Sequence, residues 1–329
     1  MKKRIIPKIL SIVLAITLFA MAPLFLTACG APTQLNTVAK EAAKDYYKNH
    51  VSYENFTNTT YEYEQNSTRK NPVELEYLAS AEGTEKTKGT FTNIEELNEV
   101  YKFYVVNVGE RIAIVIDINA VSTEKTFSVD ATYLLKETNE ENSRHTIYKL
   151  SFVEDGDNIT YYLTKEITSK EYGKEATTTK FYREYDEDDY IVAVEKILSS
   201  LNKQLIENGY FDIATGEMSM FYSNLITIEG SGANVKAKIN YDSFYIYDSQ
   251  IIDTSMNYEV GFENNKIGKI SLSEKMMSDN EYNETTSKLN VKFSVENVNT
   301  NIDLNGATKN TSIYVLSYDI PKISFGFYE

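Results

Sequence analysis

The regular alternation of apolar and polar residues constrains the fold of this chain more than any other feature of its sequence. Between positions 111 and 118 every second residue is isoleucine, at Ile112, Ile114, Ile116 and Ile118. The same period of two recurs in residues 127–135, 148–152 and 288–296. This pattern is typical of antiparallel strands that bury one face and expose the other to water. Turn sequences separate the strands, and we expect hairpin turns at Asp155-Gly156, Asn264-Asn265 and Asn305-Gly306.

Two segments instead show the three- to four-residue spacing of an amphipathic helix. Residues 189–208 place their apolar side chains on one stripe, at Tyr190, Val194, Ile197, Leu198, Leu201 and Leu205. The acidic run at 186–189 offers an N-cap and complements the helix dipole, and Gly209 ends the helix. A shorter and weaker stripe predicts another helix over residues 37–49.

The two predicted helices divide the chain into similar halves. Each half begins with a helix and continues as strands for more than 100 residues. We therefore expect an α+β fold of mostly antiparallel strands. Two arrangements fit: one large curved sheet with the helices across its concave side, or two similar helix-plus-meander units over residues 38–187 and 188–329. The chain has five prolines and no long Gly/Ser linker, so we expect no hinge.

The first 28 residues have the layout of an export signal. The basic start consists of Lys2, Lys3, Arg4 and Lys8. An uncharged and mostly apolar run over residues 9–26 follows, as in a signal peptide. Its 18 residues are at the lower end of the length that spans a membrane. Pro23 and the sequence that follows it favour a cleaved signal over a transmembrane anchor.

The sequence Leu26-Thr27-Ala28-Cys29 resembles the lipobox of bacterial lipoproteins, in which an aliphatic residue and two small ones precede an obligatory cysteine. The chain has one cysteine, and it stands at this position. The resemblance implies that the Cys29 thiol accepts a diacylglyceryl group. It also implies that a signal peptidase cuts between Ala28 and Cys29. Apart from this covalent lipid, we expect no cofactor and no metal.

Lipidation at Cys29 would place the protein on the outer, extracytoplasmic face of the cell membrane. Without residues 1–28 the chain carries 29 Lys and Arg against 48 Asp and Glu, a net charge of −19. An anionic membrane surface repels such an acidic body, so the lipid must hold it there. Residues 29–37 are expected to form a tether, whose stretch from Gly30 to Thr37 reaches about 28 Å when extended.

The order of the predicted elements is similar to that of LolA- and LppX-like carriers. A helix, a long antiparallel meander, a second helix and further strands follow one another. In those carriers a half-open barrel holds acyl chains beneath helices. The resemblance implies a lipid-binding function if the concave face of this sheet is roomy and apolar.

Candidate catalytic and metal-binding residues are few. The net charge of −15 argues against nucleic acid as a partner, because phosphate binding requires a basic surface. His50 and His145 are far apart, the first beyond a helix end and the second in a polar turn, and we interpret both as solvated. Oxygen ligands in residues 154–158 could hold Ca²⁺, but a tight hairpin explains this segment better because a strand pattern follows it. The acidic run at 186–189 is likewise interpreted as a helix start.

Tyrosine is abundant, with 26 residues, whereas tryptophan is absent. We interpret the clusters on predicted strands as structural rather than as a binding surface: Tyr61 and Tyr63, Tyr161 and Tyr162, and Tyr241, Tyr245 and Tyr247. The sequence favours a non-enzymatic lipoprotein that binds a ligand, either a lipid or another apolar molecule. The alternative is a surface adhesion or envelope-complex interaction module. A hydrolase would need two carboxylates that converge in a cleft, and no spacing indicates such a pair.

Overall fold

A computed structural model of the chain describes residues 33–49, 53–72, 89–129, 135–207, 211–212, 217–218, 226–247, 250–278 and 283–315. The helices in these ranges are α2 (Thr33–Asn49), η1 (Tyr53–Asn55, a 3₁₀ turn) and α3 (Glu187–Glu207). The strands of the first half are β1 (Thr59–Pro72), β2 (Gly89–Val108), β3 (Arg111–Val129), β4 (Leu135–Asp155), β5 (Asn158–Lys170) and β6 (Thr177–Tyr185). Those of the second half are β7 (Phe211–Asp212), β8 (Glu217–Met218), β9 (Ile226–Ser231), β10 (Asn234–Tyr247), β11 (Gln250–Glu263), β12 (Lys266–Ser278), β13 (Asn283–Lys292) and β14 (Thr308–Lys309).

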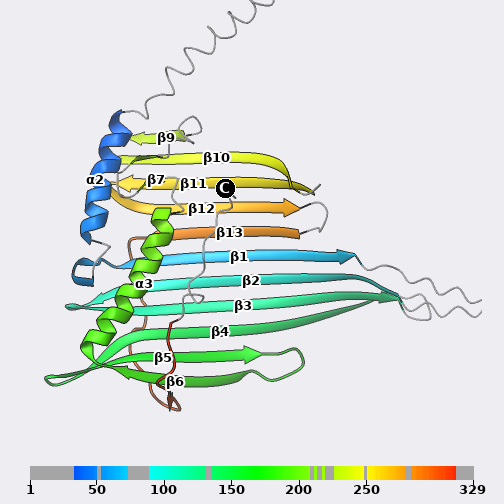
Figure 1. Ribbon diagram of the computed structural model, residues 1–329, viewed down its shortest axis with the longest axis horizontal. Coiled ribbons are helices and arrows are strands. Elements are labelled where there is room, and N and C mark those ends of the chain that lie inside the picture. The colour runs from blue at the N-terminus through cyan, green and yellow to red at the C-terminus, as the bar shows by residue number, and fades with distance from the viewer. Residues whose placement is uncertain are drawn as a thin grey trace, which may run out of the picture.

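Twelve of these strands form one open sheet in the order β14-β6-β5-β4-β3-β2-β1-β13-β12-β11-β10-β9 (Figure 1). Neighbouring strands are antiparallel, except that β14 and β6 are parallel. β7 and β8 pair separately. The predicted class, mostly antiparallel β with helices, is therefore confirmed, and the strands form a single large sheet.

Strands β1 and β13 join the two halves of the chain at the centre of the sheet. Their ladder runs from Thr60 opposite Lys292 to Arg69 opposite Asn283. Helix α3 follows β6 near one edge, and strand pairing in the large sheet resumes at β9 on the opposite edge. From β9 the strands of the second half pair in chain order through β10, β11 and β12 to β13, which lies beside β1. The two halves thus share one sheet, while the proposed boundary between residues 187 and 188 stays a prediction.

Both helices lie on the same face of the sheet, near one end of the strands (Figure 1). The strand alternation brings apolar side chains to this face, where they form one core with the helices. The helical part of this core consists of Leu35, Val38, Ala39, Ala42, Tyr46, Tyr190, Val194, Ile197, Leu198 and Leu201. Its fully buried sheet residues include Phe103, Ile112, Ile114, Ile116, Tyr148, Leu150, Leu163 and Phe262.

Helix α2 begins at Thr33, earlier than the predicted start at Thr37. Leu35 is 1% exposed and extends the apolar stripe of Val38 and Ala42 by one turn, so this turn packs into the core. The expectation that residues 29–37 form an extended tether is therefore wrong for residues 33–37. Helix α3 begins and ends within two residues of its predicted bounds.

The interpretation of residues 127–135 as one strand is wrong. β3 ends at Val129, β4 begins at Leu135, and these two residues are partners in the ladder. Residues 130–134 lie outside the described part of the chain. The two arms of a hairpin each keep a period of two, so alternation alone does not reveal that the chain reverses.

Two of the three predicted hairpin turns are confirmed. Gly156 has a φ of 62° between β4 and β5. Asn264 and Asn265 have φ values of 52° and 60° between β11 and β12, as a two-residue turn with two left-handed positions requires. The chain also turns at Asn305-Gly306, but there it forms no hairpin. The following strand, β14, pairs in parallel with β6 instead.

The chain after β13 crosses the face of the sheet that lies opposite the helices. Two hydrogen bonds hold it there, from the Thr60 hydroxyl to the Ser294 carbonyl (2.8 Å) and from the Lys149 ammonium to the Asn301 carbonyl (3.1 Å). Burial lowers the pKa of Lys149. The chain then pairs with the edge strand through β14, and Ile313 enters the core on the helix side. Residues 293–315 therefore wrap around the β6 edge, and we call them the C-terminal strap.

Asp186 caps helix α3, as the acidic run predicts. Its carboxylate accepts a hydrogen bond from the Asp189 amide at 2.8 Å, and its carbonyl accepts one from the Tyr190 amide at 3.0 Å. We expect Asp186→Ala to lower the free energy of unfolding by about 1 kcal/mol, because this substitution leaves a helix-end amide without its cap. Urea unfolding followed by circular dichroism measures the change. The exposed Asp188→Ala is the control, expected within about 0.5 kcal/mol of wild type, and equal losses in both variants would contradict the cap assignment.

Candidate functional site

A cleft of about 650 Å³ lies between helix α3, strands β4 to β6, and the end of the C-terminal strap. This volume falls within the range of about 300–1,000 Å³ that is usual for small-molecule sites. The apolar residues of its described lining are Leu150, Leu163, Tyr185, Val192, Ala193, Ile197, Tyr314 and Val315. The polar ones are Arg183, Asp189, Lys196, Ser199 and Ser200. The cleft is thus mostly apolar, with a few charged groups.

Three residues in register across neighbouring strands form the floor of the cleft. Leu150 of β4 is paired with Leu163 of β5, which in turn is paired with Arg183 of β6. The two leucines are almost completely buried in the core, at 1% and 0% exposure. Two apolar positions and one cation therefore lie side by side on the helix face of the sheet.

Helix α3 covers the cleft with a second row of side chains, which lies next to the row that enters the core. Positions 189, 193, 196 and 200 recur at three- and four-residue steps and line the cleft. Val192, at the margin of this row, is 46% exposed. An exposed valine beside a cleft is apolar surface that a ligand could cover.

Two tyrosine rings contact the guanidinium of Arg183. Its Cζ lies 4.5 Å from the ring centroid of Tyr185 on the same strand. It also lies 4.4 Å from the ring centroid of Tyr314 of the strap. Both distances are those of cation–π contacts. Burial raises the pKa of Tyr185, so its hydroxyl stays neutral at physiological pH.

One nitrogen of the Arg183 guanidinium lacks a partner among the residues that the structure describes. This atom, Nη1, is buried and has no hydrogen-bond partner there. Two other cations on β6 and β14 are paired: Lys180 lies 3.3 Å from Glu166, and Lys309 lies 2.8 Å from Glu184. A buried polar atom without a partner is rare in folded proteins, and here it marks a group that could take a ligand.

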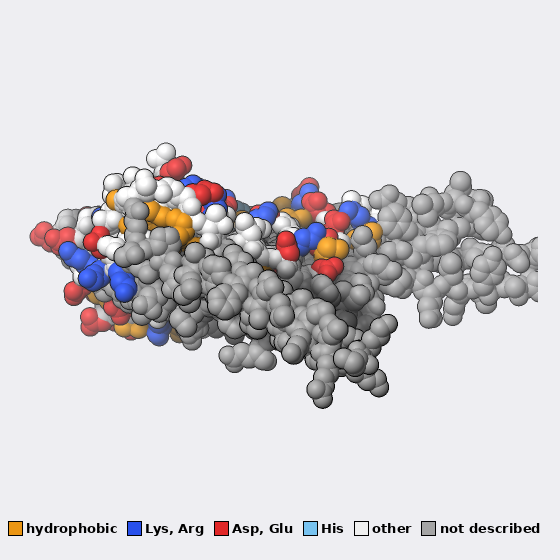
Figure 2. Space-filling view, turned by 90° about the horizontal axis from the view of Figure 1, so that it is seen from above, with side chains coloured by type: hydrophobic (Ala, Val, Ile, Leu, Met, Phe, Trp, Pro, Cys, Tyr) orange, Lys and Arg blue, Asp and Glu red, His pale blue; other side chains and the backbone are white. Residues whose placement is uncertain are grey.

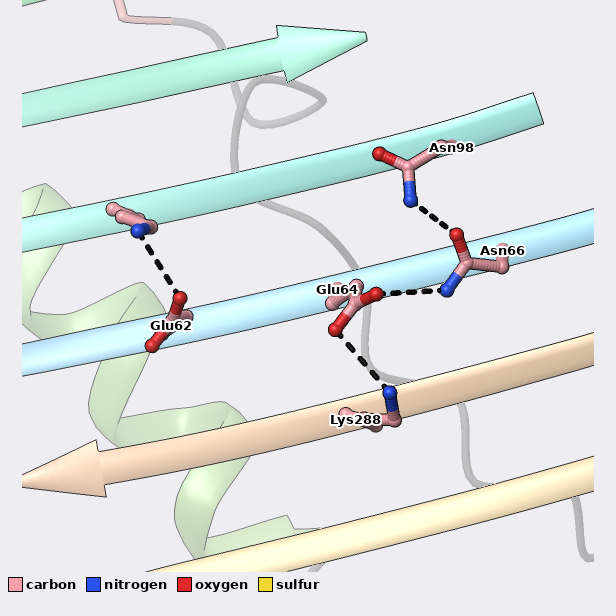
Figure 3. A network of polar contacts seen from close by, with 6 residues as sticks. Glu62, Glu64, Asn66, Asn98 and Lys288 are labelled. Atoms are coloured by element: carbon pink, nitrogen blue, oxygen red, sulfur yellow. Dashed lines mark hydrogen bonds and ion pairs between the residues drawn. The ribbon is translucent and has the colours of Figure 1, made fainter. Parts of the chain in front are cut away.

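A different polar arrangement covers the face of the sheet opposite the helices (Figure 3). Glu64 of β1 lies 3.4 Å from Lys288 of β13 and accepts a hydrogen bond of 2.9 Å from Asn66. Asn98 of β2 donates in turn to Asn66. The hydrogen bond from Asn66, with the charge of Lys288, holds the pKa of Glu64 below its usual range. These side chains satisfy one another, so this network indicates a solvated sheet face rather than a site.

Opposite charges also alternate elsewhere on the surface. In the view of Figure 2, acidic and basic side chains are interspersed, with a small group of hydrophobic side chains among them. Lys238 of β10, for example, lies 2.9 Å from Glu229 and 3.7 Å from Glu259. Exposed pairs of this kind contribute about 0–1 kcal/mol each. On the described surface in this view, the net acidity is not gathered into one patch.

Several residues singled out in the sequence lie outside the described ranges, namely the lipobox with Ala28 and Cys29, and His50. His145 does not lie in a polar turn, as expected, but in β4, because its segment continues as a strand. Its Nε2 lies 2.7 Å from the carboxylate of Asp117 on β3. Residues 154–158 form the hairpin between β4 and β5, as preferred. Among the residues that the structure describes, no three His, Cys, Asp or Glu side chains are grouped to hold a metal.

The tyrosine clusters lie largely in the core. Tyr61, Tyr63 and Tyr161 are 3–5% exposed, and Tyr241 is half-buried. The side chains of Tyr245 and Tyr247 are outside the described set. The structural interpretation is therefore confirmed for the buried ones. A carboxylate pair for a hydrolase is not assembled in the described lining of the cleft, which holds Asp189 as its one carboxylate.

Sequence reasoning missed Arg183, although a signal for it exists. In the alternating segment 181–185, Arg183 shares a strand face with Phe181 and Tyr185. A charged residue in the apolar phase of a strand is a candidate for a functional role, because such a position normally holds a core side chain. Its position in the cleft and its contact with the strap became visible only in the tertiary structure.

The fold and the cleft define a mostly β protein with one open sheet and a helix-covered apolar recess. No family model matches this chain, and no curated protein is significantly similar to it. Within the described ranges, no helix is both long and apolar enough to span a membrane.

Proposed function

We propose that this protein is a lipoprotein, anchored through Cys29 to the outer face of the cell membrane, that binds an apolar ligand in the cleft beneath helix α3 without catalysing a reaction. The lipobox residues Leu26-Thr27-Ala28-Cys29 support the anchor and the location. The observation that carries the binding function is the cleft itself, about 650 Å³ in volume and mostly apolar in its described lining.

The chemistry of the lining supports an apolar ligand. Leu150 and Leu163 beneath the cleft are buried in the core, so the apolar surface open to a ligand comes from side chains such as Val192 of α3 and Tyr314 of the strap, which are 46% and 49% exposed. Water forms few hydrogen bonds with an apolar lining. Each Å² of apolar surface that a ligand covers contributes about 25 cal/mol to the free energy of binding. An apolar chain or ring system that lies between α3 and the sheet would therefore bind favourably.

The arrangement of elements supports the comparison with lipid carriers. Both helices lie on one face of an open antiparallel sheet, and the cleft lies between a helix and that sheet. This is the arrangement in which LolA- and LppX-like carriers hold acyl chains. We therefore place lipids first among the apolar ligands to be tested.

Filling the cleft should displace the ligand. Ser200 lies in the row of α3 side chains that covers the cleft, and its hydroxyl bonds only to the Lys196 carbonyl of its own helix among the described contacts. We expect Ser200→Trp to weaken ligand binding about tenfold, or by about 1.4 kcal/mol of binding free energy, so that less of the protein carries a ligand. Native mass spectrometry of full-length protein, gently extracted from membranes, measures the bound mass.

Glu195→Trp is the matched control, because residue 195 is exposed on the same helix and does not line the cleft. The chain has no native tryptophan, so fluorescence reports each introduced ring separately. We expect blue-shifted emission at position 200, water-like emission at position 195, and wild-type ligand content in the control. A wild-type protein that carries no ligand, and takes up none when oleyl alcohol, oleate or oleyl phosphate is added, would refute the proposed function.

A further inference from the structure

We propose that the ligand of the cleft carries an anionic head group, and that Arg183 binds it while the apolar chain lies against exposed side chains of the lining such as Val192 and Tyr314. This inference rests on the proposed function and narrows its ligand class to anionic amphiphiles. The shared chemistry is a carboxylate or phosphate oxyanion joined to a long hydrocarbon chain.

Two ring contacts restrict the space around Arg183. The ring centroids of Tyr185 and Tyr314 lie 4.5 and 4.4 Å from its Cζ, so both rings are in cation–π contact with the guanidinium. The N–H donors of a guanidinium all point outward in its own plane. An oxyanion that approaches in this plane can bind two of these donors at once, as a carboxylate or phosphate does.

Arg183 has an unused hydrogen-bond donor within the described ranges. Its Nη1 is buried without a partner there, and no ion pair joins Arg183 to a described carboxylate. Asp189 also lines the cleft, yet it makes no such pair with this guanidinium. A buried charged donor that lacks an acceptor is costly, whereas hydrogen bonds to charged groups are among the strongest that proteins make. A bound oxyanion would provide the missing acceptor.

The charge of the described lining also favours an anion. Arg183 and Lys196 are positive and Asp189 is negative, so these groups sum to one positive charge. The chain as a whole carries −15. A locally positive recess in an acidic protein attracts anions to this place rather than to the rest of the surface.

The register of the strands indicates how the head group and the hydrocarbon chain of such a ligand would be oriented across the sheet. Leu150, Leu163 and Arg183 are partners across β4, β5 and β6. Neighbouring strands are about 4.8 Å apart, so Arg183 lies about 10 Å from Leu150 across the sheet. Both leucines are buried, so a hydrocarbon chain would lie above them, against the exposed Val192 of α3, while its head group reaches the guanidinium on β6.

Three probes with the same hydrocarbon chain test this inference: oleate, oleyl phosphate and oleyl alcohol. Each is titrated into full-length protein extracted in a non-ionic detergent, and native mass spectrometry measures occupancy. We expect at least one anion to bind wild type about tenfold more tightly than the alcohol does, as the strength of charge-assisted hydrogen bonds suggests. In Arg183→Gln this preference should fall to within about twofold.

The control is Arg144→Gln, which removes the same charge from an exposed position on β4 outside the described lining. It should keep the full preference for the anion. Arg183→Lys, which keeps the positive charge, should retain part of the preference and shows whether a loss in Arg183→Gln comes from charge or from misfolding. A thermal unfolding curve accompanies each variant.

The outcomes separate the two proposals. If oleyl alcohol binds as tightly as both anions in wild type, the apolar site stands and the anionic head group is wrong. The same conclusion follows if the preference survives in Arg183→Gln. If none of the three probes binds, the proposed function itself fails. A preference for either anion that depends on Arg183 supports the inference, and the tighter anion then identifies the head group.

Discussion

Replacing Cys29 by serine is expected to abolish lipid attachment to this protein. A serine hydroxyl does not take the place of the thiolate as nucleophile, so no diacylglyceryl group is added. The signal peptide then stays uncut, or the protein leaves the membrane fraction. Acyl chains contribute about 0.8 kcal/mol per buried CH₂ to membrane binding, so protein that is cut but not lipidated should leave the membrane fraction almost completely. Metabolic labelling with a radioactive fatty acid, followed by fractionation, measures both effects.

Gly30→Ser provides the matched control, because it introduces the same side chain one position beyond the lipobox. This variant should be labelled and processed like wild type. Equal incorporation of the fatty acid into wild type and Cys29→Ser would show that Cys29 is not the site of lipidation. The anchor and the location proposed for the protein would then both be wrong.

Shortening Tyr190 should be among the most destabilising single changes on helix α3. The side chain is fully buried, and its hydroxyl donates to the Ile112 carbonyl of β3 at 2.6 Å. Its ring lies 4.7 Å from that of Tyr161 on β5. Tyr190→Phe leaves a buried carbonyl short of a donor and should cost about 1–3 kcal/mol of unfolding free energy. Tyr190→Ala also opens a cavity and should cost about 3–5 kcal/mol. Urea unfolding followed by circular dichroism tests both values.

Tyr190 also makes the free energy of unfolding depend on pH. Burial raises the pKa of Tyr190 above its ordinary value, so the unfolded chain loses this proton first as the pH rises. Stability from this group is complete below about pH 10 and declines at higher pH. Tyr190→Phe should therefore lose less stability than wild type between pH 9 and about pH 11.

Tyr172 is the control for both measurements, because it is 55% exposed in the turn between β5 and β6. Tyr172→Phe and Tyr172→Ala should stay within about 0.5 kcal/mol of wild type. If Tyr190→Phe is as stable as wild type, the hydrogen bond to Ile112 does not contribute, and α3 is held to the sheet by apolar contacts alone.

Local sequence patterns predicted most of the elements of the fold. The isoleucines from Ile112 to Ile118 lie along β3, with the first three of them in the core. The acidic run at 186–189 caps α3, and the Asn264-Asn265 pair turns between β11 and β12. These predictions succeeded because each depends on the backbone preferences and side-chain spacing of a few neighbouring residues.

Predictions that depended on distant partners were incomplete. Alternation over 127–135 did not reveal that Val129 and Leu135 face each other on different strands. The pairing of β1 with β13, more than 200 positions apart in the chain, was equally invisible. The candidate site is the extreme case, because Arg183 meets Tyr314 of the strap across more than 100 positions.

The sequence by itself determined that the chain is β-rich with two amphipathic helices, and its lipobox-like motif predicts a lipid anchor at Cys29. Side-chain periodicity and a four-residue motif are local, so they can be read directly. The tertiary structure alone decided that both halves share one sheet, and that the strap closes a cleft beside Arg183. Strand order and the surroundings of a side chain follow from contacts between remote segments, and no local pattern encodes them.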